Sequence, residues 1–450
     1  MQKNLAIKAI IIGVLMLLLG LPLLMIQSTI SERMVFRDNA ARSIAQDSVG
    51  EQQVYGPVLV IPYDESYNVE EKNGDRKEVR RQTVHATHLI FPNQLEVVSR
   101  LGTERRYRGI HQVLMYNGAH RVSGDFVVPP LSDIPHKVIG SDIKLGLPFV
   151  ALAVADVRGV HDFPRLVWGL QNFEFERGSG LRSQPAGLHA TLQIADVTPG
   201  PVKFSFDLNL SGMNSQEFVP LARNNRFVMS SPWPHPQFGG RFLPEQREVG
   251  DKGFQAVWRI SSLATEAQDQ LLRTERGATQ GQRAAPALDV IRTSFIEPVN
   301  VYSMADRATK YGLLFVALTF AAFFLFEVMK RLPIHPVQYA LVGLALALFF
   351  LLLLSLSEHI AFLPAYLLAS AACIVLIGYY LAHVLHDRRR GISFGAALTV
   401  LYGVLYGLLS SESNALLLGA ILLFAVLAGI MVATRKVDWY RLGDPLPARG

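Results

Sequence analysis

The chain has 450 residues, of which 50% are hydrophobic and 18% are charged, and its formal net charge at pH 7 is +6. This length exceeds that of one ordinary domain, and the apolar content excludes a disordered chain. The single cysteine, Cys373, excludes an intramolecular disulfide and any cysteine-rich zinc or iron–sulfur site. A positive mean hydropathy beside this many charges indicates apolar blocks next to a water-soluble region.

The first apolar block, residues 9–26, contains no charged residue and follows Lys3 and Lys8. A helix rises about 1.5 Å per residue, so about 20 residues cross the hydrocarbon core of a bilayer. The block is longer than the apolar region of a signal peptide, and residues 26–30 offer no small-residue cleavage site. We therefore predict an uncleaved transmembrane signal-anchor in residues 1–27 rather than a cleaved signal peptide.

The C-terminal third of the chain is almost entirely apolar from Tyr311 onward. Pro364 falls in the first turn of the long middle span, where its missing N–H costs little, so we expect no break there. We predict a five-helix transmembrane region in residues 308–434, with spans at residues 311–329, 339–356, 360–384, 392–409 and 415–433.

The charges flanking these spans predict their orientation. The short turns at residues 357–359 and 410–414 contain no Lys or Arg, whereas the opposite ends carry a net charge of +7. Lys and Arg concentrate on the cytoplasmic side of a membrane. We therefore predict six helices, both termini and the tail at residues 435–450 in the cytoplasm, and residues 28–307 in the periplasm. Since the excess basicity follows the membrane topology, nucleic-acid binding is not supported.

Residues 28–307 have the texture of a mainly-β domain. Residues 204–210 alternate perfectly between apolar and polar side chains, and similar runs occur at residues 83–91, 107–116 and 254–260. Turn signals such as Asn73-Gly74 and Asn117-Gly118 separate the runs. The fold class that we predict is mixed: an α-helical six-span membrane bundle with a large inserted periplasmic domain, built as an antiparallel, sandwich-like β structure.

Three further segments of this region are assigned by pattern. Residues 30–50 are expected to continue the first helix as a stalk, and residues 263–276 to form a surface helix followed by a loop. Residues 295–302 resemble a last strand that leads into the second membrane helix.

Several long strings resemble the CreD family of inner-membrane proteins. In the membrane region they are residues 307–327, 335–343 and 353–359; in the soluble region they are GPVLVIPY at 56–63, DVRG at 156–159 and WPHPQF at 233–238. The resemblance covers nearly the whole chain, although residues 268–286 match no part of it. It implies a bacterial inner-membrane protein linked to cell-envelope integrity and expressed under a two-component response regulator. It implies no reaction and no cofactor.

The string at residues 230–240 is the most unusual part of the soluble region. Its three prolines exclude a central strand and predict a stiff loop that carries Trp233, His235 and Phe238. Such a loop could hold a sugar, a peptide or a protein surface. The alternative is a structural loop that closes one end of the sandwich. Asp156 and Arg158 are interpreted as a pair that stabilises a turn.

Ionisable residues near the membrane spans are the second group of candidates, because such residues are costly in a bilayer. Glu327 precedes Lys330 and Arg331 on one helix face, which favours an ion pair at the interface. Glu358 and His359 lie at the outer end of the third helix, either as a proton sensor or relay or as a hydrated turn.

Small residues recur every four positions along the fifth span, at Gly395, Thr399, Gly403 and Gly407. Such a stripe lets another helix approach closely. Packing within the bundle is the first interpretation, and a homo-oligomer seam is the second.

Three hypotheses for function follow. We expect no phosphate loop, zinc-protease motif, nucleophile elbow or dinucleotide fingerprint, no metal site and no cofactor. The first hypothesis is therefore a non-enzymatic envelope protein that contacts the lipid bilayer and binds a protein, glycan or lipid-linked partner. The second is a transporter or channel for a hydrophobic or lipid substrate. The third is a carbohydrate-active enzyme, which would need paired carboxylates near Trp233 and His235.

Overall fold

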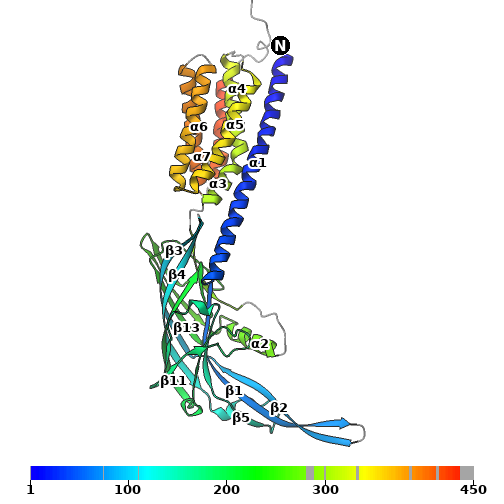
Figure 1. Cartoon of the computed structure of the whole chain (residues 1–450), viewed down its shortest axis with the longest axis vertical. Coiled ribbons are helices and arrows are strands. Elements are labelled where there is room, and N and C mark those ends of the chain that lie inside the picture. Colours follow the sequence, from blue (N-terminus) through cyan, green and yellow to red (C-terminus); the bar gives the residue numbers. More distant parts are fainter. Residues whose placement is uncertain are drawn as a thin grey trace, which may run out of the picture. The chain divides into compact units, whose positions relative to one another are not determined.

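The computed structural model describes residues 2–73, 76–109, 111–279, 288–297, 301–330, 334–384, 388–411 and 415–435. The chain forms two compact units (Figure 1): Met1–Asp38 with Val299–Gly450, here called the helical unit, and Asn39–Pro298, here called the β unit. Three predicted features lie outside the described residues: Gly74 of the predicted turn, the loop after residue 279 and the tail beyond Arg435.

The first helix, α1 (Gln2–Asp47), contains both the predicted signal-anchor and the predicted stalk. It continues through Pro22 and contributes residues to both units. The anchor and the stalk are therefore one helix, without an interruption near residue 27.

The β unit contains two sheets. One has nine strands in the order β14-β17-β12-β1-β6-β10-β9, with β2 and β5 also paired to β1; the other has eight in the order β15-β16-β13-β3-β4-β11-β7-β8. The strands of the first sheet are β1 Gln52–Asn73, β2 Arg76–Ile90, β5 Asp142–Leu145, β6 Phe149–Val154, β9 Glu176–Arg177, β10 Gly187–Thr191, β12 Ser215–Phe218, β14 Pro236–Gly240 and β17 Ile291–Phe295. Those of the second are β3 Gln94–Arg108, β4 His111–Val128, β7 Arg165–Trp168, β8 Gln171–Glu174, β11 Gly200–Met213, β13 Asn224–Ser231, β15 Gln246–Gly250 and β16 Gly253–Ser261.

The sheets are mixed rather than purely antiparallel, which corrects the prediction. β1 pairs with β12 in parallel and β13 pairs with β3 in parallel, while the other described pairings are antiparallel. Alternation of apolar and polar side chains predicts a strand with one buried face, but it carries no information on the direction of the neighbouring strand.

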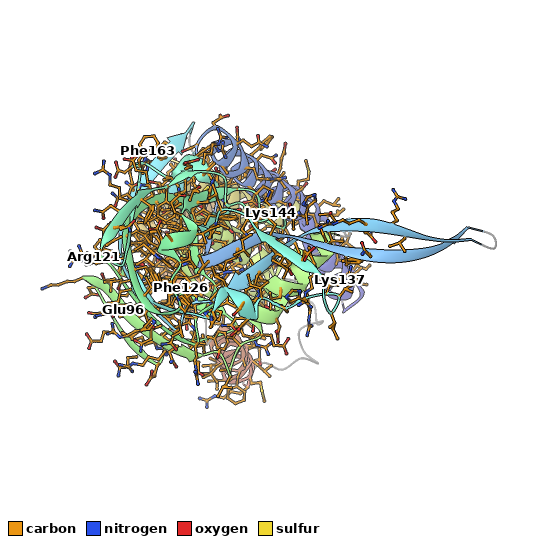
Figure 2. All side chains as sticks on the ribbon, turned by 90° about the horizontal axis from the view of Figure 1, so that it is seen from below. Glu96, Arg121, Phe126, Lys137, Lys144 and Phe163 are labelled. Carbon is orange, nitrogen blue, oxygen red and sulfur yellow. The ribbon has the colours of Figure 1, made fainter. Side chains whose placement is uncertain are left out.

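Strand β11 shows why the alternating pattern gives this fold. Phe204, Phe206 and Leu208 are buried, while the residues between them face outward. The ring of Phe126, on the paired strand β4, lies 5.1 Å from that of Phe204. Figure 2 shows Phe126 inside the β unit and Glu96 and Arg121 at its periphery. Burial of such rings from both sheets is the main stabilising contribution to this core.

Strands β1 and β2 extend beyond their sheet as a two-stranded ribbon (Figure 1). Their pairing runs from Leu59↔Ile90 to Asn73↔Arg76. The short strand β5 supports β1 only over Tyr63–Ser66, where Tyr63 pairs with Leu145.

The helix expected at residues 263–276 is α2 (Ala267–Thr279). Ala267 and Leu271 pack on Val58 and Val60 of the nine-stranded sheet. Asp289 caps the N-terminus by accepting hydrogen bonds from the Glu266 backbone N–H (3.0 Å) and the Thr265 hydroxyl (3.1 Å).

The strand expected at residues 295–302 is only partly correct. β17 ends at Phe295, and Val301 begins a helix, α3 (Val301–Lys310). A bend of 44° then separates Val301–Lys310 from Gly312–Leu325, the first part of α4 (Gly312–Lys330). The β-branched and aromatic residues at 299–302 favoured a strand, but Tyr302 is buried by helical packing rather than in a sheet.

The remaining helices are α5 (Pro336–Ser357), α6 (Phe362–Val384), α7 (Arg388–Ser410) and α8 (Ala415–Thr434). Among the described residues, four helices are long and apolar enough to cross a membrane, or five if the bent pair is one span. Leu417–Val432 of α8 is a shorter apolar helix. Aromatic rings fill the interior of this unit; the centroid of Tyr402 lies 4.7 Å from those of Phe315 and Phe349.

Candidate functional site

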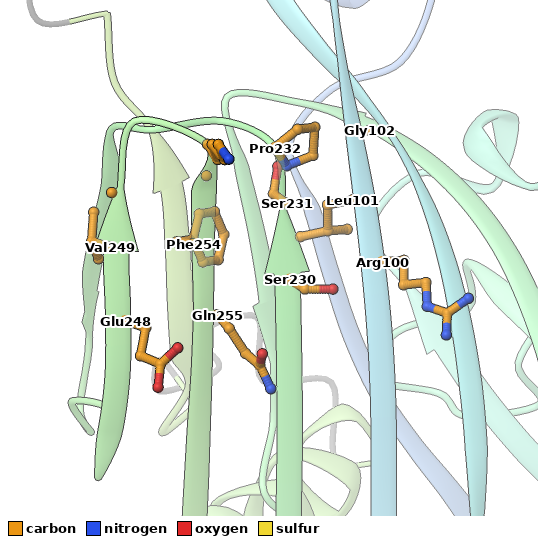
Figure 3. Close-up of a pocket in the computed structure, with 13 residues that line it drawn as sticks. Arg100, Leu101, Gly102, Ser230, Ser231, Pro232, Glu248, Val249, Phe254 and Gln255 are labelled. Atoms are coloured by element: carbon orange, nitrogen blue, oxygen red, sulfur yellow. The ribbon is translucent and has the colours of Figure 1, made fainter.

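A groove of about 740 Å³ opens at one end of the eight-stranded sheet (Figure 3). Four polar side chains cross it as a row, one from each of four adjacent strands. The register pairs Glu248 with Gln255, Gln255 with Ser230 and Ser230 with Arg100. Residues in register share a face of the sheet, so these four side chains line the groove side by side.

The far end of the groove is formed by the tight connection between β15 and β16. Gly253 has a φ of +124°, and a Cβ there would lie 2.0 Å from the Ser231 carbonyl oxygen and 2.7 Å from the Pro232 Cα. Only glycine permits this close approach of two backbones. Val249, whose side chain is 51% exposed, supplies apolar surface, and Lys252 a further cation, whereas Leu101 and Phe254 border the groove from the core.

Residues 232–235 connect β13 to β14 and are here called the Trp233 loop. The loop continues directly from the groove, because Ser231 and Pro232 line the groove. The Trp233 indole N–H donates to the carbonyl oxygens of His235 (3.2 Å) and Ile296 (3.1 Å). The Arg105 guanidinium lies 5.8 Å from the indole centroid and pairs with Glu297 at 3.3 Å. These contacts hold the ring in a fixed orientation.

The three candidates from this loop have different surroundings. His235 is exposed, whereas Trp233 is half-buried. Phe238 packs its edge on Phe254 and Trp258, with ring centroids 5.6 Å apart in both cases. Phe238 therefore belongs to the aromatic core, and His235 and the open side of Trp233 are available to a ligand.

The prediction of a loop throughout residues 230–240 is wrong at both ends. Ser230 and Ser231 end strand β13, and Pro236–Gly240 form strand β14. β14 lies at the edge of its sheet, paired with β17 from Pro236↔Phe295 to Gly240↔Ile291. An edge strand tolerates proline because one of its sides needs no ladder hydrogen bond.

In the helical unit, Glu327 is held by residues from two other helices. Its carboxylate forms an ion pair with Lys8 of α1 and accepts a hydrogen bond of 2.7 Å from the Tyr339 hydroxyl of α5. The Lys8 ammonium also donates to the Ile334 carbonyl at 2.5 Å. The predicted partners Lys330 and Arg331 have side chains outside the described set. Glu327 is only 9% exposed, so this inter-helix pair satisfies an otherwise unfavourable charge.

Glu358 has a similar environment at the C-terminal end of α5. Its carboxylate lies 3.5 Å from the Arg33 guanidinium and accepts a hydrogen bond of 3.3 Å from the Tyr302 hydroxyl. The Glu358 side chain is 11% exposed, whereas the neighbouring His359 is exposed. The interpretation of both residues as a hydrated turn therefore fits His359 and not Glu358.

Glu327 and Glu358 have the same arrangement of partners, and we call these two groups of residues the α1 clamps. Each clamp consists of a cation from α1, a carboxylate and a tyrosine hydroxyl: Lys8, Glu327 and Tyr339 in one, Arg33, Glu358 and Tyr302 in the other. Lys8 and Arg33 are 25 residues apart, which is about 38 Å along a helix. The clamps thus fasten α1 within the helical unit at two distant points.

The C-terminus of α1 is fixed within the β unit by Asp156 and Arg158. Arg158 pairs with Asp156, as predicted, and also donates to the carbonyls of Ala45 (3.0 Å) and Gln46 (2.5 Å). Asp156 accepts a hydrogen bond of 3.2 Å from the Gly50 N–H. The hydrogen bond from the Arg158 side chain is the main reason that the pKa of Asp156 is lowered. A cation at a helix C-terminus also interacts favourably with the helix dipole.

Most of the small-residue stripe on α7 contacts no other helix among the described residues, which differs from the first interpretation. Gly403 and Gly407 are exposed, and a Cβ at either position would meet no described atom within 4 Å. A Cβ at Gly395 would lie 3.8 Å from Ile374, and the Thr399 hydroxyl donates to the Gly395 carbonyl. The period of four placed these residues on one side of α7, of which only the Gly395 end lies against α6.

The expectation that the chain contains no G-x-S-x-G string is wrong. Residues 391–395 read GISFG, the letters of a nucleophile elbow, but they lie inside α7, whereas an elbow requires a strand-to-helix turn. Within the described ranges, no three His, Cys, Asp or Glu residues are grouped to hold a metal ion.

The family described as "Inner membrane protein CreD" matches residues 4–440. The chain is also 38% identical over 429 residues to "Inner membrane protein CreD" of Escherichia coli (strain K12), which covers 95% of this chain and 92% of that protein. With its several apolar helices, the chain is a multi-pass membrane protein that belongs to the CreD family of inner-membrane proteins.

Proposed function

We propose that this protein is a non-enzymatic component that supports the integrity of the cell envelope and binds an envelope partner through its β unit. The groove beside the Trp233 loop is the observation that carries the proposal. It combines a row of polar groups, Glu248, Gln255, Ser230 and Arg100, with the exposed apolar side chain of Val249. Few polar groups placed on an apolar concave surface are typical of a binding site.

The topology of the proposal has six membrane helices, both termini in the cytoplasm and the β unit in the periplasm. Its support is the asymmetric distribution of Lys and Arg around the spans. The test is cysteine labelling in a Cys373→Ala background. Leu263→Cys, at a side chain that is 97% exposed, should react with a membrane-impermeant maleimide in intact cells. Arg435→Cys should react only after lysis, and the reverse result would refute the orientation.

The binding role is tested by photocrosslinking in cells. A crosslinking amino acid at Gln255 or His235 should capture one specific envelope component. The same group at Lys203, an exposed position on β11 outside the groove, should not. Trp233→Ala combined with His235→Ala should reduce capture from position 255. Equal capture from all three positions, or no effect of the double variant, would refute this site.

Hydrolysis of a glycan receives less support from the groove. Glycosidases generally need two carboxylates flanking the bond, and Glu248 is the one carboxylate among the residues that line it.

Transport of a hydrophobic or lipid substrate is the second candidate function, and the 44° bend between α3 and α4 favours it. Interrupted helices are common in transporters. The polar residues Asp306, Arg307 and Lys310 of α3 instead fit a helix at the membrane surface. Substrate flux in proteoliposomes that disappears in Glu358→Ala, but not in His359→Ala, would support transport. If proteoliposomes show no flux above that of empty liposomes, transport of the hydrophobic or lipid substrate in the assay is excluded.

A further inference from the structure

A second groove lies in the helical unit, between the antiparallel helices α6 and α7 (Figure 1). Its volume is about 780 Å³, within the range of small-molecule sites. It is lined by Ile374, Val375, Gly378, Tyr379, Ala382, His383, Arg388, Gly391, Ile392 and Gly395. None of these side chains is used by the β unit or by the α1 clamps.

Three glycines give the groove its shape. A Cβ at Gly391 would lie 2.6 Å from the Cβ of Ala382, so glycine there allows the two helices to approach closely. A Cβ at Gly378 would lie 3.8 Å from the Gly391 carbonyl oxygen, and one at Gly395 would lie 3.8 Å from Ile374, both ordinary van der Waals distances. Because the two glycines carry no side chains, they form the floor of the groove. Val375 and Ile392 project beside them and are mostly exposed, so they form apolar walls.

One end of the groove is polar and cationic. Arg388, the first residue of α7, is exposed there, and His383 is the second-last residue of α6. The His383 Nδ1 is 2.9 Å from the Tyr379 carbonyl, which directs Nε2 away from the backbone. Among the described residues that line the groove, none is Asp or Glu.

We propose that this groove binds one anionic phospholipid, with the headgroup phosphate on Arg388 and an acyl chain along Gly378 and Gly395. Charge complementarity carries the choice of occupant, because an apolar trough that ends in a cation matches an amphiphile with a negative head. Basic pockets between membrane helices bind anionic lipid headgroups in this way. A second copy of the chain would instead have to cover Arg388 with an apolar helix face, which is unfavourable.

The site depends on Arg388 for selectivity and on the open glycines for the acyl chain, so two kinds of variant separate these roles. Arg388→Gln should remove the preference for anionic lipid and leave binding of zwitterionic lipid unchanged. Arg388→Lys should keep part of the preference, because the charge remains but the bidentate geometry is lost. Gly378→Ile should fill the trough and reduce retention of both lipids.

The experiment is native mass spectrometry of the full-length protein released from bilayers of phosphatidylglycerol and phosphatidylcholine in equal amounts. We expect the wild-type protein to retain phosphatidylglycerol about tenfold over phosphatidylcholine, the selectivity of one charge-assisted contact. Matched controls are Arg435→Gln, another cation at a helix end, and Gly403→Ile, on α7 outside the groove. The controls should behave like the wild type, and thermal unfolding in detergent checks that each variant is folded.

Several outcomes would overturn the proposal. One is equal retention of the two lipids by the wild-type protein, and another is an effect of the controls as large as that of Arg388→Gln. Loss of the preference in millimolar inorganic phosphate would show a site for the headgroup anion alone. A disulfide-linked dimer formed efficiently by Ile392→Cys in a Cys373→Ala background would show that a second copy covers the groove.

Discussion

The two units of this protein place apolar and charged groups in opposite ways. In the β unit, rings such as Phe126 and Phe204 are buried, and charged pairs such as Arg121–Asp207 are exposed. In the helical unit, Leu17 (73% exposed) and Phe424 (74% exposed) face outward, while the Glu327 carboxylate is buried. The comparison shows that each surface matches its own solvent, water in one case and lipid in the other.

The buried polar groups also differ in how they are satisfied. In the β unit, the Tyr116 hydroxyl lies 3.0 Å from the Ser215 carbonyl and 2.8 Å from Gln216 Oε1, and the buried Glu65 carboxylate accepts from the backbone N–H groups of Lys137 (2.7 Å) and Val138 (3.0 Å). Inside the helical unit the clamps are ionic. Breaking one ion pair leaves a charge without a counterion, whereas losing one neutral hydrogen bond leaves only a dipole.

The largest effect should follow from opening the Lys8–Glu327 clamp. Lys8→Met leaves the Glu327 carboxylate buried without its cation, which should destabilise the protein by about 3–5 kcal/mol. Combining it with Glu327→Gln should recover most of this loss. The measurement is thermal unfolding of full-length protein in detergent micelles. A double variant no more stable than Lys8→Met would show that the ion pair is not the cause.

The next effect concerns His120 in the core of the β unit. Burial lowers its pKa from the usual 6.5 to about 4; its Nδ1 bonds to the Ser99 hydroxyl at 2.8 Å, and its Nε2 has no described partner. As pH falls from 6.5 to 4, the unfolded chain takes up a proton that the folded chain does not. Stability should therefore decrease by about 3 kcal/mol over this window.

Denaturant unfolding followed by tryptophan fluorescence at pH 7 and pH 4.5 measures this loss. His120→Leu should remove most of it, and His235→Leu, at an exposed position, should not. A pH dependence that is unchanged in His120→Leu would assign it to other groups.

A smaller effect is expected at the C-terminus of α1. Arg158→Ala removes the hydrogen bonds to the Ala45 and Gln46 carbonyls, and the loss of stability should be smaller than that of Lys8→Met because Arg158 is half exposed. Increased hydrogen exchange at residues 44–48 is the appropriate readout. No local change in exchange would contradict a capping role.

The smallest effect should come from exposed pairs of the eight-stranded sheet. Arg165 and Glu174 lie 3.3 Å apart and are both more than 70% exposed. Arg165→Ala should cost less than about 0.5 kcal/mol, because water and salt screen such pairs. A loss as large as that of Lys8→Met would mean that the contrast between the two units is wrong.

The glycine stripe and the clamps illustrate what could be predicted for the site. Gly395, Thr399, Gly403 and Gly407 were correctly placed on one helix face, but the face that contacts α6 depends on the rotation of α7, which the period does not give. Glu327 was recognised as a costly charge, yet its partner Lys8 lies 319 residues away in the chain. Local spacing favoured Lys330 and Arg331, and no pattern within one segment could identify Lys8.

The apolar spans, the long alternating strands and the family could all be predicted from the residues alone, because each depends on the order of residues within a segment or along the whole chain. The tertiary structure decided the parallel pairings, the edge position of β14, the row of polar groups in the groove and the partners of Glu327 and Glu358. These features depend on which distant segments meet. Contacts between distant segments are selected by the packing of the whole fold, and local periodicity carries no record of them.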